Sequence, residues 1–249
     1  MLLNIPHASN NIPKCYMDQF ILSDEELRLE LLRMTDLYAE EIFQPETALL
    51  LTINISRLVV DVTRLEDDRK EPLCQVGMGK IPMKTSFGKL LRRSLSEQEI
   101  NGLYSTVYLP FHRTLCKVVE KELMEKGKAL IVECHTFPNH PLPYDPEQTT
   151  PRLDACVSVS PFHTPYKLLE LVMEGLVTDS GISVSPEWPL SRPMVPAVFF
   201  NKDSRVSSIL IGINRSLFMD EETGEKTSRF THVAASMHNV LKKVAVFDR

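Results

Sequence analysis

The chain lacks the long apolar runs, the excess of positive charge and the cysteine pairs that mark several classes of protein. No apolar run in its 249 residues approaches the roughly 18 residues that a membrane span needs. The formal net charge of -5 gives no reason to expect nucleic acid or an anionic membrane as a partner. Its five cysteines include no Cys-x-x-Cys, which favours reduced thiols over a disulfide framework. The N-terminus has neither the basic region nor the apolar stretch of a signal peptide, so we expect a cytoplasmic protein.

Hydrophobic residues make up 43% of the chain and charged residues 24%, as in ordinary soluble globular proteins. Short apolar runs predict strands over Leu2–Ile5, Ala48–Ile55, Leu58–Val62, Leu130–Cys134, Ala155–Val159, Ala197–Phe200 and Ser208–Ile213. The second and third of these runs could also form one strand, interrupted at residues 56–57. Strands that alternate with helices predict an α/β protein with a parallel or mixed sheet. No linker or repeat divides the chain, so residues 1–249 are expected to form a single domain.

The helices are predicted from capping boxes and from the spacing of apolar residues. Ser23 begins a helix whose apolar stripe continues through Tyr38 and Ile42. Ser96 begins a second helix, which should kink or break near Pro110. Two further helices are predicted over 165–177 and 230–244.

Two short apolar runs end in histidine. His7 follows the first strand, and His135 follows Glu133 at the end of a central one. Ligands and catalytic groups collect at strand ends in α/β proteins, and histidine is the commonest metal ligand among side chains. The pattern therefore suggests a metal-centred active site, although each histidine could equally be an ordinary hydrogen-bonded side chain. Glu133 could orient a ligand, act as a base, or pair with an arginine.

Catalytic zinc usually takes three protein ligands and keeps one position for water. Neither His-Glu-x-x-His nor His-x-x-Glu occurs here, so a third ligand must be distant in sequence from the other two. Asp36, expected on the polar side of the first helix, is one candidate among several carboxylates.

Arginines near predicted strand ends are candidates for binding a substrate carboxylate, because guanidinium binds carboxylate in a planar fork. Arg64 closes the run 58–62, and Arg57 lies seven positions earlier. The alternative for Arg64 is a salt-bridge network with the acidic residues 66–68. Asn214 and Arg215 close the last predicted strand, and this polar pair is a further candidate for binding the substrate.

These residues lie in blocks that resemble the N-formylglutamate amidohydrolase family, in the order seen in that family. The blocks are Ile5–Ser9, Leu22–Glu26, Thr35–Tyr38, Ser56–Arg64, Glu133–Pro138 and Ile213–Asp220. Together they extend over nearly the whole chain, and their order is more specific than any block alone.

The resemblance implies a fold like that of zinc carboxypeptidases, with a mixed central sheet flanked by helices. It implies hydrolysis of N-formyl-L-glutamate to formate and glutamate, a late step in one route of histidine degradation. By the same resemblance His7, Asp36 and His135 would bind the metal. Arg64, with Arg57 as second choice, would bind a substrate carboxylate.

Three departures from the family pattern stand out. Glu133 occupies a position where the family usually has Asp, and Thr136 one where it usually has Ser. Gly212 stands where relatives tend to carry Glu, the expected counterpart of the carboxypeptidase general base. Since glycine cannot take a proton, either Glu133 or another carboxylate serves as the base, or the protein is catalytically weak; Glu133 is the candidate base that we name.

The sequence thus predicts a zinc-dependent amidohydrolase with one zinc per chain, acting on a small N-acyl amino acid such as N-formylglutamate. One alternative is a carboxypeptidase-like deacylase of other specificity. Another is a catalytically weakened or non-catalytic relative that binds a ligand, which Gly212 favours. Neither nucleic acid nor a membrane is an expected partner.

Overall fold

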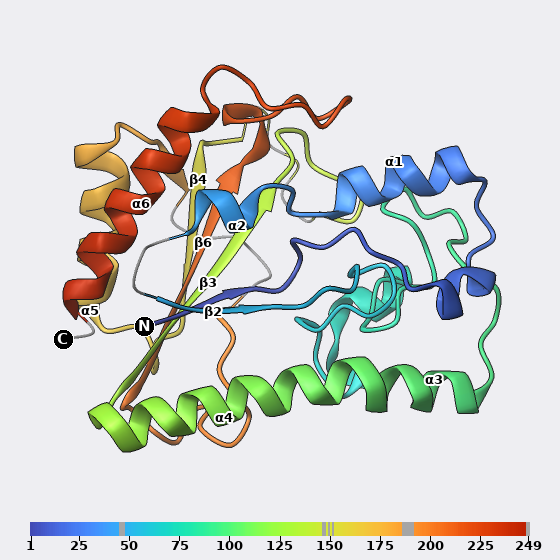
Figure 1. Cartoon of the computed structure of the whole chain (residues 1–249), viewed down its shortest axis with the longest axis horizontal. Coiled ribbons are helices and arrows are strands. Elements are labelled where there is room, and N and C mark those ends of the chain that lie inside the picture. The colour runs from blue at the N-terminus through green and yellow to red at the C-terminus, as the bar shows by residue number, and fades with distance from the viewer. Residues whose placement is uncertain (45–47, 146–147, 149, 151, 186–191, 248–249) are drawn as a thin grey trace.

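A six-stranded mixed sheet forms the centre of the protein (Figure 1). The computed structural model describes residues 1–44, 48–145, 148, 150, 152–185 and 192–247. The strands are β1 (Leu2–Ile5), β2 (Leu49–Thr52), β3 (Ala129–Phe137), β4 (Ala155–Val159), β5 (Val184–Ser185) and β6 (Val206–Asn214). Their order is β2-β1-β3-β6-β4-β5, and every neighbouring pair is parallel except β4 with β6. The predicted α/β class with a mixed sheet is confirmed.

Two predicted strands are wrong. Residues 58–62 and 197–200 lie in turns rather than in the sheet. In the first, the backbone N–H of Val59 donates to Ser56; in the second, the N–H of Phe199 donates to Pro196. Leu58 and Val59 are buried although they pair with none of the described strands. Their apolar character therefore reflects burial of a turn, which period-two reasoning does not separate from a strand.

Helices cover both faces of the sheet. They are α1 (Asp24–Met34), α2 (Ala39–Ile42), α3 (Glu97–Leu103), α4 (Leu109–Lys126), α5 (Tyr166–Met173) and α6 (Phe230–Phe247). Figure 1 shows α5 and α6 on one side of the sheet and α4 on the other. Leu130 and Val132 of β3 pack in the same apolar cluster as α5 and α6, whereas Ile131 packs with residues of α4. This alternation gives β3 a buried side chain on each face.

Shorter helical segments connect these elements. The 3-10 helices are Lys14–Gln19, Asp68–Lys70, Pro72–Val76 and Arg215–Leu217, and the π-helical segments are Tyr104–Tyr108 and Glu174–Asp179. The capping boxes at Ser23 and Ser96 are both present. The break expected near Pro110 takes the form of a π-helical turn, in which the N–H of Leu109 donates to Tyr104, five residues back.

The first helix ends earlier than its apolar stripe predicts. It stops at Met34, Thr35 is extended, and Tyr38 has a left-handed backbone with φ 64°. The hydroxyl of Tyr38 donates to the carbonyl of Gly224 at 2.7 Å, a tertiary contact that accompanies this conformation. Asp36 therefore lies in the connection between α1 and α2, not on a helix as expected.

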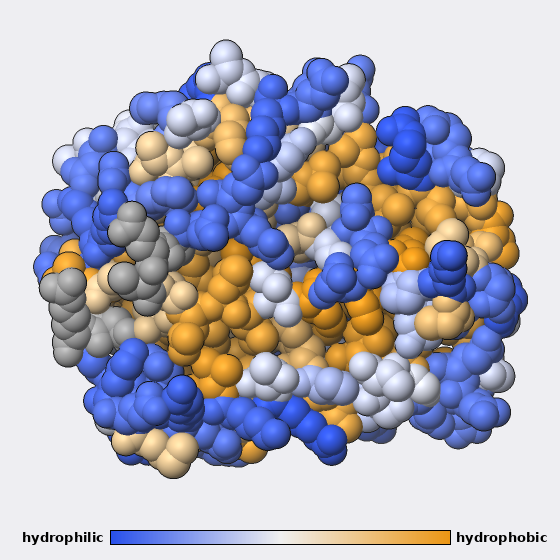
Figure 2. All heavy atoms as spheres, in the orientation of Figure 1, coloured by the Kyte–Doolittle hydropathy of each residue, from blue (hydrophilic) through white to orange (hydrophobic). Residues whose placement is uncertain are grey.

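Hydrophilic side chains border the face drawn in Figure 2, and apolar side chains extend across its middle, including the area over the edge strand β2. Leu49 and Leu50 of β2 are about half exposed. Within the described residues, none of the helices has the length and hydropathy required to span a bilayer.

Candidate metal centre

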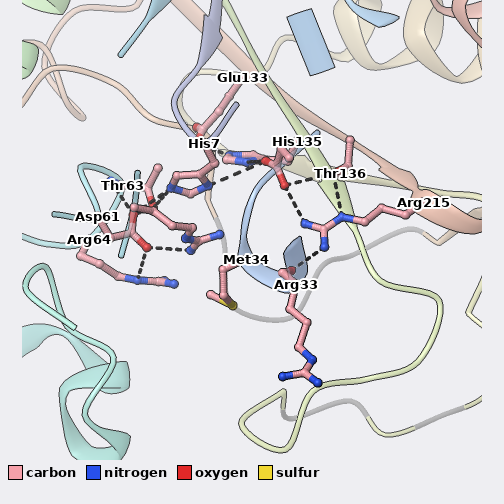
Figure 3. Close-up of polar contacts among 12 residues, drawn as sticks. His7, Arg33, Met34, Asp61, Thr63, Arg64, Glu133, His135, Thr136 and Arg215 are labelled. Atoms are coloured by element: carbon pink, nitrogen blue, oxygen red, sulfur yellow. Dashed lines mark hydrogen bonds and ion pairs between the residues drawn. The ribbon is translucent and has the colours of Figure 1, made fainter. Parts of the chain in front are cut away.

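His7, Asp36 and His135 come together where the parallel strands β1 and β3 end. Figure 3 shows the rings of His7 and His135 side by side. Their potential ligand atoms all lie within 4.8 Å of one another. One carboxylate oxygen of Asp36, Oδ2, is 3.0 Å from His135 Nδ1 and 3.8 Å from His7 Nδ1. The N–H of Asp36 donates to the carbonyl of His7, which fixes the connection between α1 and α2 beside β1.

This group of side chains fits a metal ion. His7 Nδ1 is buried, and no hydrogen-bond partner for it occurs in the described part of the chain. A buried polar atom without a partner is costly, and a metal ion would satisfy its lone pair. Two imidazoles and one carboxylate are also a ligand set that catalytic zinc uses. The three residues named by the family resemblance are therefore the ones that the fold assembles.

Asp36 is held by a buried arginine and a threonine. Its Oδ1 accepts hydrogen bonds from Thr136 Oγ1 at 3.0 Å and from an Arg215 guanidinium nitrogen at 3.1 Å. Burial opposes ionisation of Asp36, but His135 and Arg215 outweigh it and keep the pKa of this carboxyl below its usual range. Asp36 thus remains a carboxylate and turns Oδ2 toward the two histidines.

Glu133 contacts the other side of the His135 ring. Its Oε1 lies 2.9 Å from His135 Nε2, and its Oε2 accepts the backbone N–H of Met194 at 2.5 Å. Burial alone would lower the pKa of His135, but its hydrogen bonds to Asp36 and Glu133 raise the pKa to about 9. Among the described residues no arginine pairs with Glu133, and both of its oxygens are already engaged.

Asp61 makes the matching contact with His7, and we did not single it out from the sequence. Its Oδ1 lies 2.8 Å from His7 Nε2 and accepts hydrogen bonds from the N–H and the hydroxyl of Thr63. Its Oδ2 is 2.6 Å from Arg57 and 3.1 Å from Arg64. In the sequence, Asp61 lies four residues after Arg57 and three residues before Arg64, and this spacing is the signal that points to an ion-paired carboxylate.

These charges shift the pKa values of His7 and Asp61 in known directions. Burial and the charge of Arg57 lower the pKa of His7 to about 4, against the opposing effect of Asp61. Burial would raise the pKa of Asp61, but Arg57, Arg64 and His7 hold it well below its usual range. At neutral pH His7 is consequently a neutral imidazole that donates from Nε2 to Asp61 and presents the Nδ1 lone pair.

The three arginines predicted to bind substrate differ in their ion-pair partners, because two of them pair with Asp61 and Arg215 pairs with Asp36. Arg57 and Arg64 are each paired with Asp61, and their side chains are 14% exposed. Arg64 thus pairs with Asp61 rather than with the acidic residues 66–68. Arg215 is 3% exposed, and it donates to Asp36, to Thr136 and to a backbone carbonyl.

Asn214 and Arg215 therefore have internal partners. The Asn214 amide donates to Asn139 at 3.0 Å, and its oxygen accepts from the N–H and hydroxyl of Ser216, capping a 3-10 turn. Their placement does not support the direct contact with substrate that we predicted for these two residues. It supports a structural role for Asn214 and a positioning role for Arg215.

Gly212 lies beside His135 in the parallel register of β3 and β6. A Cβ atom at this position would be 2.6 Å from Cys156 Sγ and 3.3 Å from a ring atom of Phe137. Cys156 thus fills space that a side chain at position 212 would need. The side chain of Cys156 therefore occupies the place of a carboxylate-bearing side chain at position 212.

Two histidines, one buried and one half-buried, and a buried aspartate lie where parallel strands of the mixed sheet end, and they define an α/β protein with a candidate metal centre. The sequence model of the N-formylglutamate amidohydrolase family matches residues 1–219, and the chain belongs to this family. The resemblance predicted from the sequence blocks is confirmed. Family membership supports a hydrolase that acts on amides.

Solved structures agree with this fold. The crystal structure of N-formylglutamate amidohydrolase from Ralstonia eutropha JMP134 is similar, with a TM-score of 0.84 and 19% identity over 98% of this chain and 93% of that chain. The gene product Atu2144 from Agrobacterium tumefaciens has a TM-score of 0.68 and 18% identity over 100% and 90% of the two chains. No curated protein matches the chain significantly in sequence.

Proposed function

We propose that the protein is a zinc-dependent amidohydrolase that cleaves the amide of a small acidic N-acyl amino acid, with N-formylglutamate as the leading substrate. The observation that carries the proposal is the group of His7, Asp36 and His135, in which the buried Nδ1 of His7 has no hydrogen-bond partner among the described residues. Family membership and the name of the similar Ralstonia enzyme support the choice of acyl amino acid.

His7, Asp36 and His135 would hold the zinc, one ion per chain. When bound, zinc supplies a Lewis acid for the scissile carbonyl and lowers the pKa of a water molecule at its open position. Asp61 orients the His7 ring, while Arg215 and Thr136 leave one Asp36 oxygen for the metal. These supporting contacts fix the geometry of the ligands before substrate arrives.

Arg57 and Arg64 would bind the substrate. Each places one nitrogen on Asp61, and guanidinium has further N–H donors for a carboxylate. Asp61 holds the two cations next to each other and near the metal position, because the same carboxylate also contacts His7. A substrate carboxylate on this pair would direct the acyl amide toward the zinc.

Gly212 favours a second candidate function, a catalytically weakened or non-catalytic relative that binds the same class of ligand. Under that alternative the chain would hold zinc and bind N-acyl amino acids without turnover. A deacylase with another acyl group is distinguished by its products, since formate, acetate and longer acids are readily separated.

The test combines metal analysis of the purified protein with a hydrolysis screen over N-formyl and N-acetyl amino acids. We expect about one zinc per chain, hydrolysis of N-formylglutamate, and loss of both metal and activity in His135→Ala. The exposed His232 provides a control, and His232→Ala should keep both. A protein without divalent metal, in which His7→Ala leaves activity intact, would overturn the proposal. Bound zinc with no turnover would favour the non-catalytic alternative.

A further inference from the structure

The segment 192–205, here called the strap, is fastened beside the candidate metal centre although none of its residues belongs to the metal group. Near one end of the strap, the Met194 carbonyl accepts the hydroxyl of Ser208 at 3.0 Å, and its N–H donates to Glu133. Further along, the N–H of Asn201 donates to His163 Nε2 at 2.8 Å. The backbone of Met194 is thus bonded to residues of two central strands, β3 and β6.

Glu133 connects the strap to His135. Glu133 is 3% exposed, and its carboxylate lies between two donors, the ring Nε2 of His135 and the backbone N–H of Met194. The opposite ring nitrogen of His135, Nδ1, faces Asp36. Glu133 therefore lies on the side of the ring away from the metal position, whereas a general base would have to reach a water molecule that the metal would hold.

We propose that the backbone amide of Met194 holds the carboxylate of Glu133, which in turn orients the ring of His135. Through these two contacts the strap sets the metal affinity of the site. Glu133 is then a positioning residue rather than the general base that the sequence suggested. This inference rests on the proposed metal site but assigns the role to residues outside the ligand set.

The physical basis is the outer layer of hydrogen bonds around a metal ligand. A carboxylate on the far nitrogen of a ligating imidazole fixes the ring orientation and tautomer, and its loss typically lowers metal affinity by about 10- to 100-fold. A carboxylate held by a charge-assisted bond to a backbone amide is itself restrained. Removing that amide should free Glu133 to rotate and weaken the restraint on His135.

A pair of substitutions at one position isolates the amide. Met194→Ala removes the side chain but keeps the N–H, whereas Met194→Pro also removes the N–H. We expect Met194→Pro to bind Co²⁺ and Zn²⁺ about 10-fold more weakly than Met194→Ala, with a changed visible spectrum of the Co²⁺ form. Ala197→Pro is the control for proline in the strap. It occupies the second position of the turn closed by Phe199 and Pro196, where proline fits, and should bind both metals like the wild type.

Glu133→Gln separates the two roles of Glu133. For a positioning residue, metal affinity falls and activity recovers as zinc is raised to saturation. For a general base, metal affinity is retained and kcat stays low at saturating zinc. The glutamine keeps an oxygen for one donor but turns an NH₂ group toward the other, and one of the two contacts is therefore lost. This variant also tests the inference without introducing a proline.

The outcomes distinguish this inference from the proposed function. If the wild-type protein binds neither Co²⁺ nor Zn²⁺, the metal site itself is refuted. If the wild type binds both metals, and Met194→Pro binds them as tightly as Met194→Ala, the strap has no role and only this inference is overturned. Retained affinity in Glu133→Gln, with a low kcat, would return the base role to Glu133.

Discussion

Substituting Gly212 by alanine should destabilise the protein, because the new Cβ would overlap the side chain of Cys156. The ideal Cβ lies 2.6 Å from Cys156 Sγ. Ordinary contact distances between nonbonded heavy atoms are about 3.5–4.0 Å, so the two atoms overlap by roughly 1 Å. Cys156 is 3% exposed and packs with Phe137 and Leu210, and it therefore has little room to withdraw.

The expected cost follows from two opposing effects. Overpacking a buried cluster costs about 1–3 kcal/mol. Replacing glycine by alanine also restricts the unfolded chain, which returns about 0.4–1 kcal/mol where the backbone suits alanine. Gly212 lies within β6, in extended backbone that alanine also adopts. We therefore expect Gly212→Ala to lower the free energy of unfolding by about 1–2 kcal/mol.

A double-mutant cycle with Cys156→Ala tests this reasoning. Cys156→Ala removes the sulfur that the Cβ would meet, so Gly212→Ala should become neutral or slightly stabilising in that background. Urea unfolding at one pH gives the four free energies, and we expect a coupling energy of about 1–3 kcal/mol. An equal cost of Gly212→Ala in both backgrounds would refute the steric explanation.

The Cys156→Ala background also allows a test of whether a carboxylate at position 212 would restore a general base. Gly212→Glu alone combines a new acid with the clash, whereas the variant that also carries Cys156→Ala offers the acid a place beside His135. A large gain in turnover in the double variant would support a disabled base position. An unchanged rate would place the base elsewhere.

Three other predictions concern the surroundings of the site. Asp61→Asn should weaken zinc binding by about 10- to 100-fold in chelator competition, because the charged partner of His7 is lost; unchanged affinity would exclude an orienting role. Arg64→Met should raise KM for N-formylglutamate and leave zinc affinity unchanged, and the reverse pattern would contradict substrate binding by Arg64. Burial lowers the pKa of His112, whose Nε2 donates to Val62. A histidine whose pKa is lower in the folded state than in the unfolded state takes up its proton more readily after unfolding. Its contribution to the free energy of unfolding is therefore complete above the pKa of the unfolded state, about 6.5, and is lost as the pH falls. Urea titrations should therefore show a smaller loss of stability from pH 7 to 5 in His112→Gln than in the wild type, and equal losses would contradict this.

The positions of the two histidines could be predicted because each follows a short apolar run. What the sequence did not supply was the pairing of β1 with β3, which brings together His7 and His135, 128 positions apart in the chain. The sequence pattern offers Asp36 only as one candidate for the third ligand, and the family resemblance is what singles it out. Apolar spacing would have continued the helix past it, whereas Tyr38 adopts a left-handed backbone and bonds Gly224, which is 186 positions away.

Asp61 is a residue whose surroundings the apolar pattern of the sequence predicts wrongly. It lies inside a block that the resemblance selected, but the apolar residues around it suggested a strand. In the structure the block is a buried turn, and the N–H of Asp61 donates to the carbonyl of Lys80. Period-two patterns identify burial, and only long-range hydrogen bonds distinguish a buried turn from a strand.

The balance of charge in the site gives a reason to expect an acidic substrate that does not depend on either arginine alone. Carboxylates and guanidinium groups that are buried or half-buried occur in equal number in the site, as Asp36, Asp61, Glu133, Arg57, Arg64 and Arg215. Metal ligation requires neutral imidazoles, so a divalent cation adds positive charge to a set that is otherwise balanced. Because uncompensated buried charge is costly, a carboxylate on the substrate should contribute more than its hydrogen bonds to Arg64. N-formylglutamine has nearly the shape of N-formylglutamate with one carboxylate fewer. We expect its kcat/KM to be lower by at least about 10-fold, corresponding to 1.4 kcal/mol, and equal values would show that charge balance does not select the substrate.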